Sequence, residues 1–121
     1  MNGVIESSVK IDAMLEPLLL AGSDDEVHEY LSGLIEVHAE RVIKKIIHYK
    51  LHLASSDQRE EADDLYHEVL VQLLRELREM RMRPDEHPIS DVRGMAAIIA
   101  HRTCSRWMRR QFPERHALKN R

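Results

Sequence analysis

The sequence predicts an all-α protein, a compact bundle of three main helices with a short N-terminal helix. Apolar residues recur at every third or fourth position along three long segments, which is the period of an amphipathic helix. Leu, Ile, Glu and Arg are abundant among the 121 residues, whereas Gly and Pro number four each, and this composition favours helices over strands. A chain of this length is expected to form one domain around a single core.

The first expected element is a short helix from about residue 9 to residue 20, disturbed by Pro17. Small residues then break the chain, and Ser23 or Asp24 can cap the helix that follows, because their side-chain oxygens accept hydrogen bonds from free helical N–H groups. This second helix has one apolar face and is expected to end near His52.

Two further helices are expected beyond this point. Residues 55–57, with the sequence Ser-Ser-Asp, mark a turn and a cap before a third helix, whose apolar face runs over residues 62–80. Residues 83–88 form the clearest loop, since each of their two prolines disfavours helix in the residue before it. Ser90 can cap the fourth helix, which stops before Pro113.

Charge is sorted along the chain. Residues 1–40 hold nine acids and one base, residues 41–80 hold eight acids and seven bases, and residues 81–121 hold four acids and ten bases. The balances of −8, −1 and +6 leave a net charge of −3. The chain as a whole is not expected to bind polyanions, but its basic C-terminal part can do so locally.

These patterns divide the chain into a short N-terminal helix and turn (1–22), the main helical domain (23–115) and a basic tail (116–121). Cys104 is the only cysteine, which excludes an internal disulfide and favours a reducing compartment. The first residues lack the basic and apolar regions of a signal peptide, and no apolar run approaches the ~18 residues needed to span a bilayer. The expected location is therefore the cytoplasm, with no membrane partner.

Three segments resemble motifs of one known family. Residues 62–70, Ala-Asp-Asp-Leu-Tyr-His-Glu-Val-Leu, resemble the (D/E)DLxQExF stretch in region 2 of bacterial RNA polymerase sigma-70 family factors, especially the extracytoplasmic-function group. Residues 18–24 are similar to the small-residue turn that opens this domain. Residues 92–108 are similar to the family's F-x-x-W-L-x-x-I-A-x-N helix, with Ile99 and Ala100 on the Ile-Ala pair. The resemblance spans nearly the whole chain.

The resemblance implies a sigma-70 region 2-like fold and a sigma factor domain that binds core RNA polymerase and recognises the promoter −10 element during transcription initiation. The implied polymerase contact is a coiled coil of the largest subunit, and the matching residues here are Asp64, His67 and Glu68. Their spacing places them on one helical face, and two carboxylates there suit a basic partner helix. An anti-sigma factor is a further candidate partner, and neither an enzymatic activity nor a cofactor is implied.

The same resemblance implies that the fourth helix faces the non-template strand near −10. Arginines at i, i+4, i+7 and i+8 form a stripe of about two turns, which comprises Arg102, Arg106, Arg109 and Arg110. Guanidinium groups at this pitch follow phosphates and stack on unpaired bases. His101, Trp107 and the segment 81–91 are the nearest candidates for base contacts. Trp107 also lies on the apolar face of its helix, where a core position is favoured.

The chain departs from the family pattern at several positions. The family's Trp-Leu pair is Met95-Ala96 here, which gives a softer core, and its Asn is Arg102, which leaves the choice of base open. Family members normally carry a helix-turn-helix domain called region 4, for which 121 residues leave no room. The expectation is either an isolated domain of a longer factor or a shortened sigma-like protein.

Two other interpretations remain open. One is an interaction module that docks on polymerase or on a regulator without opening DNA, which the missing second domain and the scarcity of aromatic residues favour. The other is a carboxylate/His metal-binding bundle, although such sites require two Glu-x-x-His motifs and two further Glu residues that point inward. Its candidate ligand pairs are Asp25 with His28, Asp64 with His67, and His48 with His52.

Overall fold

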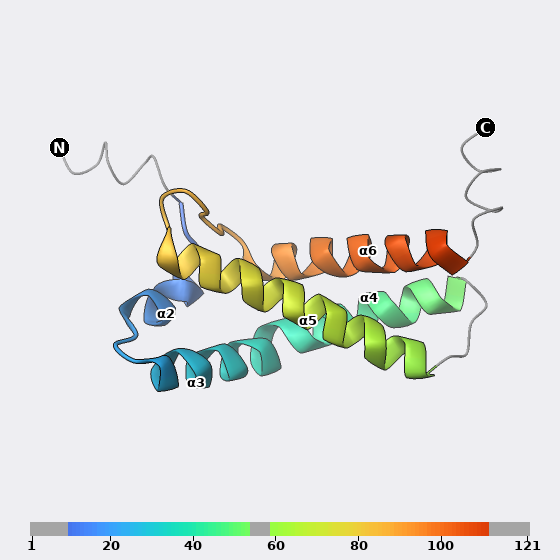
Figure 1. The fold of residues 1–121 in the computed structure, drawn as a ribbon, viewed down its shortest axis with the longest axis horizontal. Coiled ribbons are helices and arrows are strands. Elements are labelled where there is room, and N and C mark those ends of the chain that lie inside the picture. Colours follow the sequence, from blue (N-terminus) through green and yellow to red (C-terminus); the bar gives the residue numbers. More distant parts are fainter. Residues whose placement is uncertain (1–9, 54–58, 112–121) are drawn as a thin grey trace.

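The computed structural model describes residues 10–53 and 59–111, which fold into helices joined by short connections (Figure 1). In chain order the elements are η1 (Ala13–Leu15), α2 (Glu16–Leu20), α3 (Asp24–Leu34), the π-helical segment η2 (Ile35–Ala39), α4 (Glu40–Leu53), α5 (Arg59–Met82) and α6 (Val92–Gln111). No strand occurs within these two ranges. The prediction of an all-α bundle of three main helices and a short N-terminal helix is confirmed.

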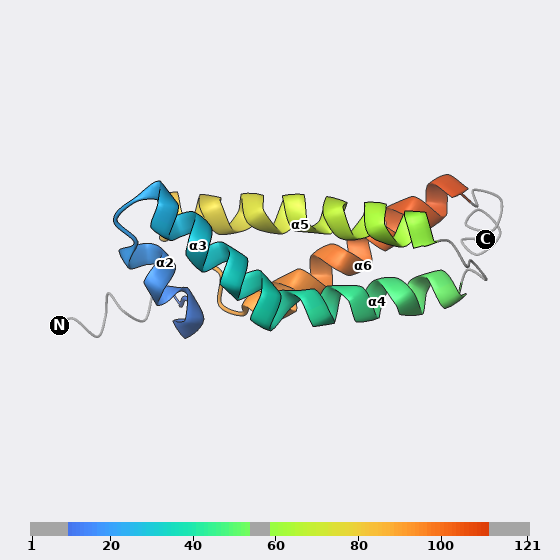
Figure 2. The ribbon, with the colours of Figure 1, turned by 90° about the horizontal axis from the view of Figure 1, so that it is seen from below.

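The bundle is formed by α4, α5 and α6, each of which packs against the other two. In the view of Figure 1, α3 leads into α4 along the lower edge of the molecule. Helix α5 runs back across them, and α6 lies above α4. The chain changes direction where α3 meets α4 (Figure 2), and η2 occupies this junction. The N–H of Glu40 donates to the carbonyl of Ile35, one residue further back than in an α-helix, and such an insertion bends a helix.

One hydrophobic core runs through the bundle. Helix α5 contributes an apolar row at intervals of three and four residues, namely Leu65, Val69, Leu73, Leu77 and Met80. Facing it, α6 buries Val92, Ala96, Ile99, Ala100, Thr103, Cys104 and Trp107. Helix α4 and the preceding segment contribute Ala39, Ile43, Ile47 and Leu51. The helical periods seen in the sequence therefore mark the core faces of the three main helices.

The beginning of α3 agrees with the sequence prediction. Ser23 is the cap, because its hydroxyl oxygen accepts a hydrogen bond of 3.2 Å from the N–H of Glu26. The carboxylate of Glu26 reaches back and accepts a bond of 3.0 Å from the N–H of Gly22. This reciprocal arrangement satisfies two N–H groups at the point where the chain turns into the bundle.

The cap of α6 differs from the prediction. Ser90 does not provide it; instead, a carboxylate oxygen of Asp91 accepts a bond of 3.0 Å from the N–H of Gly94. A second carboxylate, that of Asp12, accepts a bond of 2.9 Å from the N–H of Val92. An acid is a stronger acceptor than a hydroxyl for these free N–H groups and also interacts favourably with the helix dipole.

Asp12 also ties the N-terminal element to the bundle. Its other carboxylate oxygen accepts from the N–H of Met14 at 3.1 Å, and its own N–H donates to the carbonyl of Ile89 at 2.8 Å. The tyrosine hydroxyl of Tyr30 donates to the carbonyl of Met14. The short N-terminal helix is thus fixed to α3 and to the start of α6.

The N-terminal helix is shorter than predicted. It consists of the 3₁₀ turn η1 followed by α2, and Pro17 stands in the first turn of α2, where a missing N–H breaks no helical bond. Residues 83–91 connect α5 with α6, which confirms the predicted loop. The expected turn at 55–57 and the basic tail at 116–121 lie outside the described residues.

Candidate functional site

The residues predicted to bind polymerase lie on the outer side of α5. Asp64, His67 and Glu68 are all exposed, whereas their neighbours Leu65 and Val69 are buried in the core. Because the inner face of α5 is fixed by packing, these three side chains are held outward on a rigid helix. The helix is acidic as a whole, with seven carboxylates and four arginines.

The residues of the predicted arginine stripe are exposed on α6. The side chains of Arg102, Arg106, Arg109 and Arg110 all reach solvent, while Thr103 between them is buried. Helix α6 contains five arginines and no carboxylate. Within one helix there is thus no acid to neutralise the stripe, which favours a negatively charged partner.

The acidic face and the arginine stripe meet. Atom Nη2 of Arg106 lies 3.4 Å from Oε2 of Glu68, and the exposed fractions of the two side chains are 50% and 45%. An ion pair this exposed contributes about 0–1 kcal/mol to stability. Its importance is positional, because it joins the predicted protein-binding face of α5 to the predicted DNA-binding stripe of α6.

A groove of about 560 Å³ runs between α5 and α6, and residues of the loop before α6 also line it. Its walls carry Arg102 and Arg106 from α6 and Gln72 and Glu76 from α5. The side-chain amide of Gln72 donates to Glu76 at 3.0 Å. Exposed apolar surface comes from Ile98, which is 51% exposed. The groove therefore combines guanidinium groups, an amide and apolar surface, which suits a planar group with polar edges.

Thr103 adds an unusual polar atom to this groove. Its side chain lines the groove, yet its Oγ1 is buried and has no hydrogen-bond partner within the described part of the chain. A threonine in a helix commonly donates to the carbonyl one turn earlier. A buried hydroxyl without a partner costs about 1–3 kcal/mol.

Trp107 and His101 occupy different environments. His101 is exposed on α6, whereas Trp107 is 8% exposed and belongs to the core. The core position that its place on the apolar face favoured is confirmed. Packing against the other helices leaves little of its ring at the surface, and a contact of Trp107 with DNA stays a prediction.

Burial raises the pKa values of two groups near the acidic face, Cys104 and Tyr66. Burial raises the pKa of the Cys104 thiol to about 11, with Lys50 lowering it and Glu68 raising it to smaller extents. Burial also raises the pKa of Tyr66 to about 12, helped by Glu40, whose carboxylate accepts a hydrogen bond of 3.2 Å from the tyrosine hydroxyl. Neither group is a reactive nucleophile near neutral pH.

The proposed metal ligands do not converge. Asp25 and His28 lie on α3, whereas Asp64 and His67 lie on α5, and all four side chains are exposed instead of pointing into the bundle. Among the residues with a described position, no three His, Cys, Asp or Glu side chains are grouped so that they can share a metal ion.

Sequence analysis did not identify a second basic surface, which lies on α4. Arg41, Lys45, His48 and His52 recur at helical spacing and are all exposed. The balance of −1 over residues 41–80 concealed it, because that window averages the basic α4 with the acidic α5. Counting charge helix by helix, at the period of 3.6 residues, would have found it.

Comparison with known proteins gives no identification: the chain matches no family model, no curated protein and no solved structure. Within the described ranges, no helix has the length and apolar character that crossing a membrane requires.

Proposed function

We propose that this chain is a sigma-70 region 2-type domain that binds core RNA polymerase and recognises the non-template strand of the promoter −10 element. It would act in the cytoplasm and would have no enzymatic activity or cofactor of its own. The observation that carries the proposal is the contact between Glu68 and Arg106, which places an exposed acidic face beside an exposed arginine stripe on one helical body.

The acidic face supports the polymerase contact. Asp64, His67 and Glu68 lie within about one turn on the outer side of a helix of 24 residues. Carboxylates on a rigid helix can accept charge-assisted hydrogen bonds from a basic partner helix and so set its orientation. A coiled coil in the largest polymerase subunit is the partner that the sequence resemblance implies.

The arginine stripe and the adjoining groove support DNA binding. Arg102 and Arg109 are exposed, so their guanidinium groups are available for phosphates. An unstacked base that enters the groove beside Arg102 would meet the side-chain amide of Gln72. Recognition of an extruded base requires such polar groups at the wall of a pocket.

The second candidate function is an interaction module that docks on polymerase or on a regulator without opening DNA. The burial of Trp107 favours it, because the described part of α6 then exposes no Phe, Tyr or Trp ring on which a separated base can stack. This alternative predicts the same polymerase contact but weak DNA binding that is indifferent to sequence.

The decisive experiment measures binding of the full chain to core RNA polymerase and to a −10 oligonucleotide. We expect Asp64→Ala with Glu68→Ala to abolish capture of the polymerase while the circular dichroism spectrum is unchanged. Glu29→Ala with Glu36→Ala is the matched control, since it removes two exposed acids from elsewhere on the surface.

The oligonucleotide separates the two candidate functions. Preference for a −10 sequence over a scrambled one supports promoter recognition, whereas equal binding of both sequences supports the docking module. If the wild-type chain does not capture core polymerase, the sigma factor domain is wrong, and of the second candidate only docking on a regulator is left.

A further inference from the structure

Helix α4 carries a continuous basic surface that the proposed function does not use. We define the α4 basic face as Arg41, Lys45, His48, Tyr49 and His52, all of which are exposed. Arg41, Lys45, His48 and His52 follow the spacing i, i+4, i+7 and i+11, so they lie along one side of the helix. At a rise of 1.5 Å per residue the face is about 16 Å long.

The α4 basic face is held outward by the core. Ile43, Ile47 and Leu51 point from the same helix into the bundle and are at most 5% exposed. Rotation of α4 would expose these side chains to water, and each exposed side chain would cost about 1.5–3 kcal/mol of free energy. The basic side chains therefore remain on the surface whether or not a partner is present.

Carboxylates do not neutralise this face. Glu40 is the single acid in α4, and it is engaged on the α5 side, where it lies 3.8 Å from Lys44 and accepts a hydrogen bond from Tyr66. Within the ranges that the structure describes, neither Arg41 nor Lys45 has a carboxylate within 4.0 Å. Like charges at i and i+4 destabilise a helix, so this arrangement is better explained by binding than by stability.

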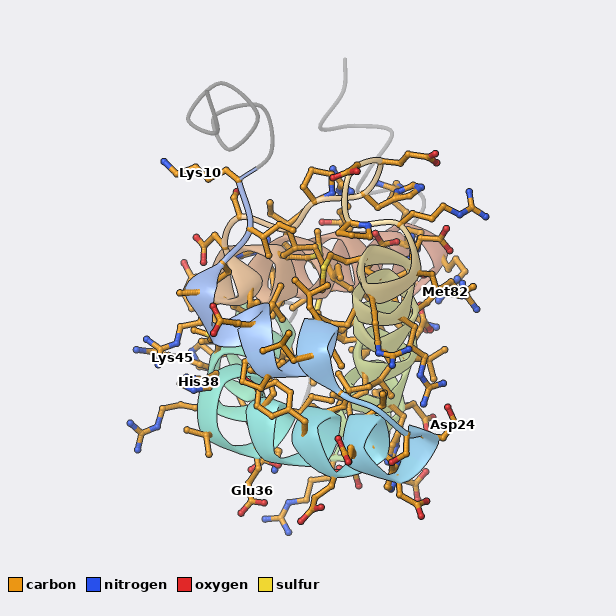
Figure 3. All side chains as sticks on the ribbon, turned by 90° about the vertical axis from the view of Figure 1, so that its left-hand side faces the viewer. Lys10, Asp24, Glu36, His38, Lys45 and Met82 are labelled. Atoms are coloured by element: carbon orange, nitrogen blue, oxygen red, sulfur yellow. The ribbon has the colours of Figure 1, made fainter. Side chains whose placement is uncertain are left out.

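The basic surface continues toward the beginning of α6. Nη2 of Arg93 lies 2.8 Å from Nδ1 of His38 in η2, which brings another guanidinium group against the junction of α3 and α4. Figure 3 shows Lys45 and His38 on one side of the molecule, with Asp24 and Met82 on the other. The guanidinium group of Arg93 on α6 therefore adds to the positive charge on this side of the molecule.

This surface is distinct from the arginine stripe. Arg102 and Arg106 face the groove between α5 and α6, and no described residue of α4 lines that groove. A ligand bound in the groove therefore does not cover the α4 basic face.

We propose that the α4 basic face binds the sugar–phosphate backbone of a nucleic acid, as a contact separate from the stripe on α6. Cations beside an exposed aromatic ring form the pattern that holds nucleic-acid strands: Arg41 and Lys45 supply the charge, and Tyr49, one turn beyond Lys45, is 60% exposed. A lipid surface fits less well, because it requires several aliphatic side chains exposed beside the bases, whereas Ile43, Ile47 and Leu51 of α4 are buried in the core. This inference does not depend on the polymerase contact.

Binding of the full chain to a labelled 30-nucleotide single strand, titrated at several salt concentrations, tests the proposal. We expect Arg41→Ala with Lys45→Ala to weaken binding on the order of tenfold and to reduce the salt slope by roughly 1.4, since each lost phosphate contact removes ~0.7. The matched control, Arg59→Ala with Arg78→Ala, removes the same charge from α5 and should change binding far less.

A second variant separates a loss of binding from a loss of folding. Lys45→Glu places an acid four residues after Arg41, so the helix should melt no earlier than the wild type, while nucleic-acid binding should fall about as much as in the double variant, since both changes reduce the charge by two units. Unchanged binding by both α4 variants overturns the proposal, as does an equal loss in the α5 control, which would indicate a response to net charge alone. Binding of poly-glutamate that the nucleic acid does not displace would also overturn it, in favour of an acidic protein. Capture of core polymerase, measured in parallel, tests the proposed function independently.

Discussion

Arg106 on α6 lies 3.4 Å from Glu68 on α5, and this pair connects the two surfaces on which the proposed function depends. A phosphate that binds Arg106 must compete with the carboxylate of Glu68. A basic helix that binds Glu68 would, in contrast, release Arg106 for DNA. The two binding events are therefore expected to favour each other through this one contact.

The first prediction follows from this competition. Glu68→Gln should raise the affinity for single-stranded DNA about two- to fivefold, the equivalent of an exposed ion pair, because Arg106 is freed. The same variant should weaken binding to core polymerase. Fluorescence anisotropy with DNA and pull-down with polymerase measure the two effects.

Asp63→Asn is the matched control for Glu68→Gln, since it removes one exposed negative charge from the same helix. An equal gain in DNA affinity with Asp63→Asn would mean that net charge, and not the contact with Arg106, governs the response.

The second prediction concerns the arginine stripe. Arg102→Ala with Arg109→Ala should weaken DNA binding and lower the salt slope by roughly 1.4, because two phosphate contacts on a single strand are lost. Both side chains are exposed, so the melting temperature should stay within a degree or two of the wild type. A salt slope equal to that of the wild type would show that the arginine stripe does not contact DNA.

The third prediction concerns the hydroxyl of Thr103. Thr103→Val keeps the branched shape and removes the unpartnered oxygen, so it should raise the free energy of unfolding by about 1 kcal/mol. Thr103→Ser keeps the hydroxyl and loses a buried methyl group, so it should lower the free energy of unfolding. Urea denaturation measures both, and a loss of stability in Thr103→Val would show that the hydroxyl is hydrogen-bonded in solution.

Much of the fold was predictable because it depends on local patterns. The apolar period located the three main helices, and the cap of α3 was narrowed to Ser23 or Asp24, of which the structure shows Ser23. The exposure of the acidic face and of the arginine stripe also followed from helical spacing, since their neighbours one residue along supply the core.

The remaining features depend on contacts between distant residues. The hydrogen bond from Val92 to Asp12 joins residues 80 positions apart, and the ion pair of Arg106 with Glu68 joins residues 38 positions apart. No local sequence pattern predicts either contact. The π-helical turn at 35–39 breaks the helical period without Pro at the bend. The groove beside Thr103 arises only when α5 and α6 pack together.

The fourth prediction tests the long-range cap. Asp12→Ala should lower the free energy of unfolding by about 1–2 kcal/mol, because the N–H groups of Met14 and Val92 both lose their acceptor. Asp85→Ala, in the exposed loop after α5, is the control and should have little effect. Equal stabilities in urea would show that Asp12 does not hold the N-terminal helix to α6.

The fifth prediction concerns stability in alkali. The thiol of Cys104 has a pKa of about 11 in the folded chain against 9.0 when exposed, because burial disfavours the thiolate. Between these values the unfolded chain releases a proton that the folded chain keeps, so the free energy of unfolding falls as the pH rises from 9 to 11 and is unaffected below that window. The raised pKa values of Tyr66 and Tyr30 act in the same direction at higher pH.

Cys104→Ala separates the contribution of the thiol from that of the tyrosines. The variant should be less stable than the wild type at pH 7, because it leaves a cavity in the core, but its melting temperature should decline less steeply as the pH rises from 9.0 to about 11. In the wild type, the thiol should also react slowly with a disulfide reagent at neutral pH until urea unfolds the chain. Parallel pH profiles for the two proteins, or rapid reaction of the folded wild type, would show that Cys104 is not sealed between α4, α5 and α6.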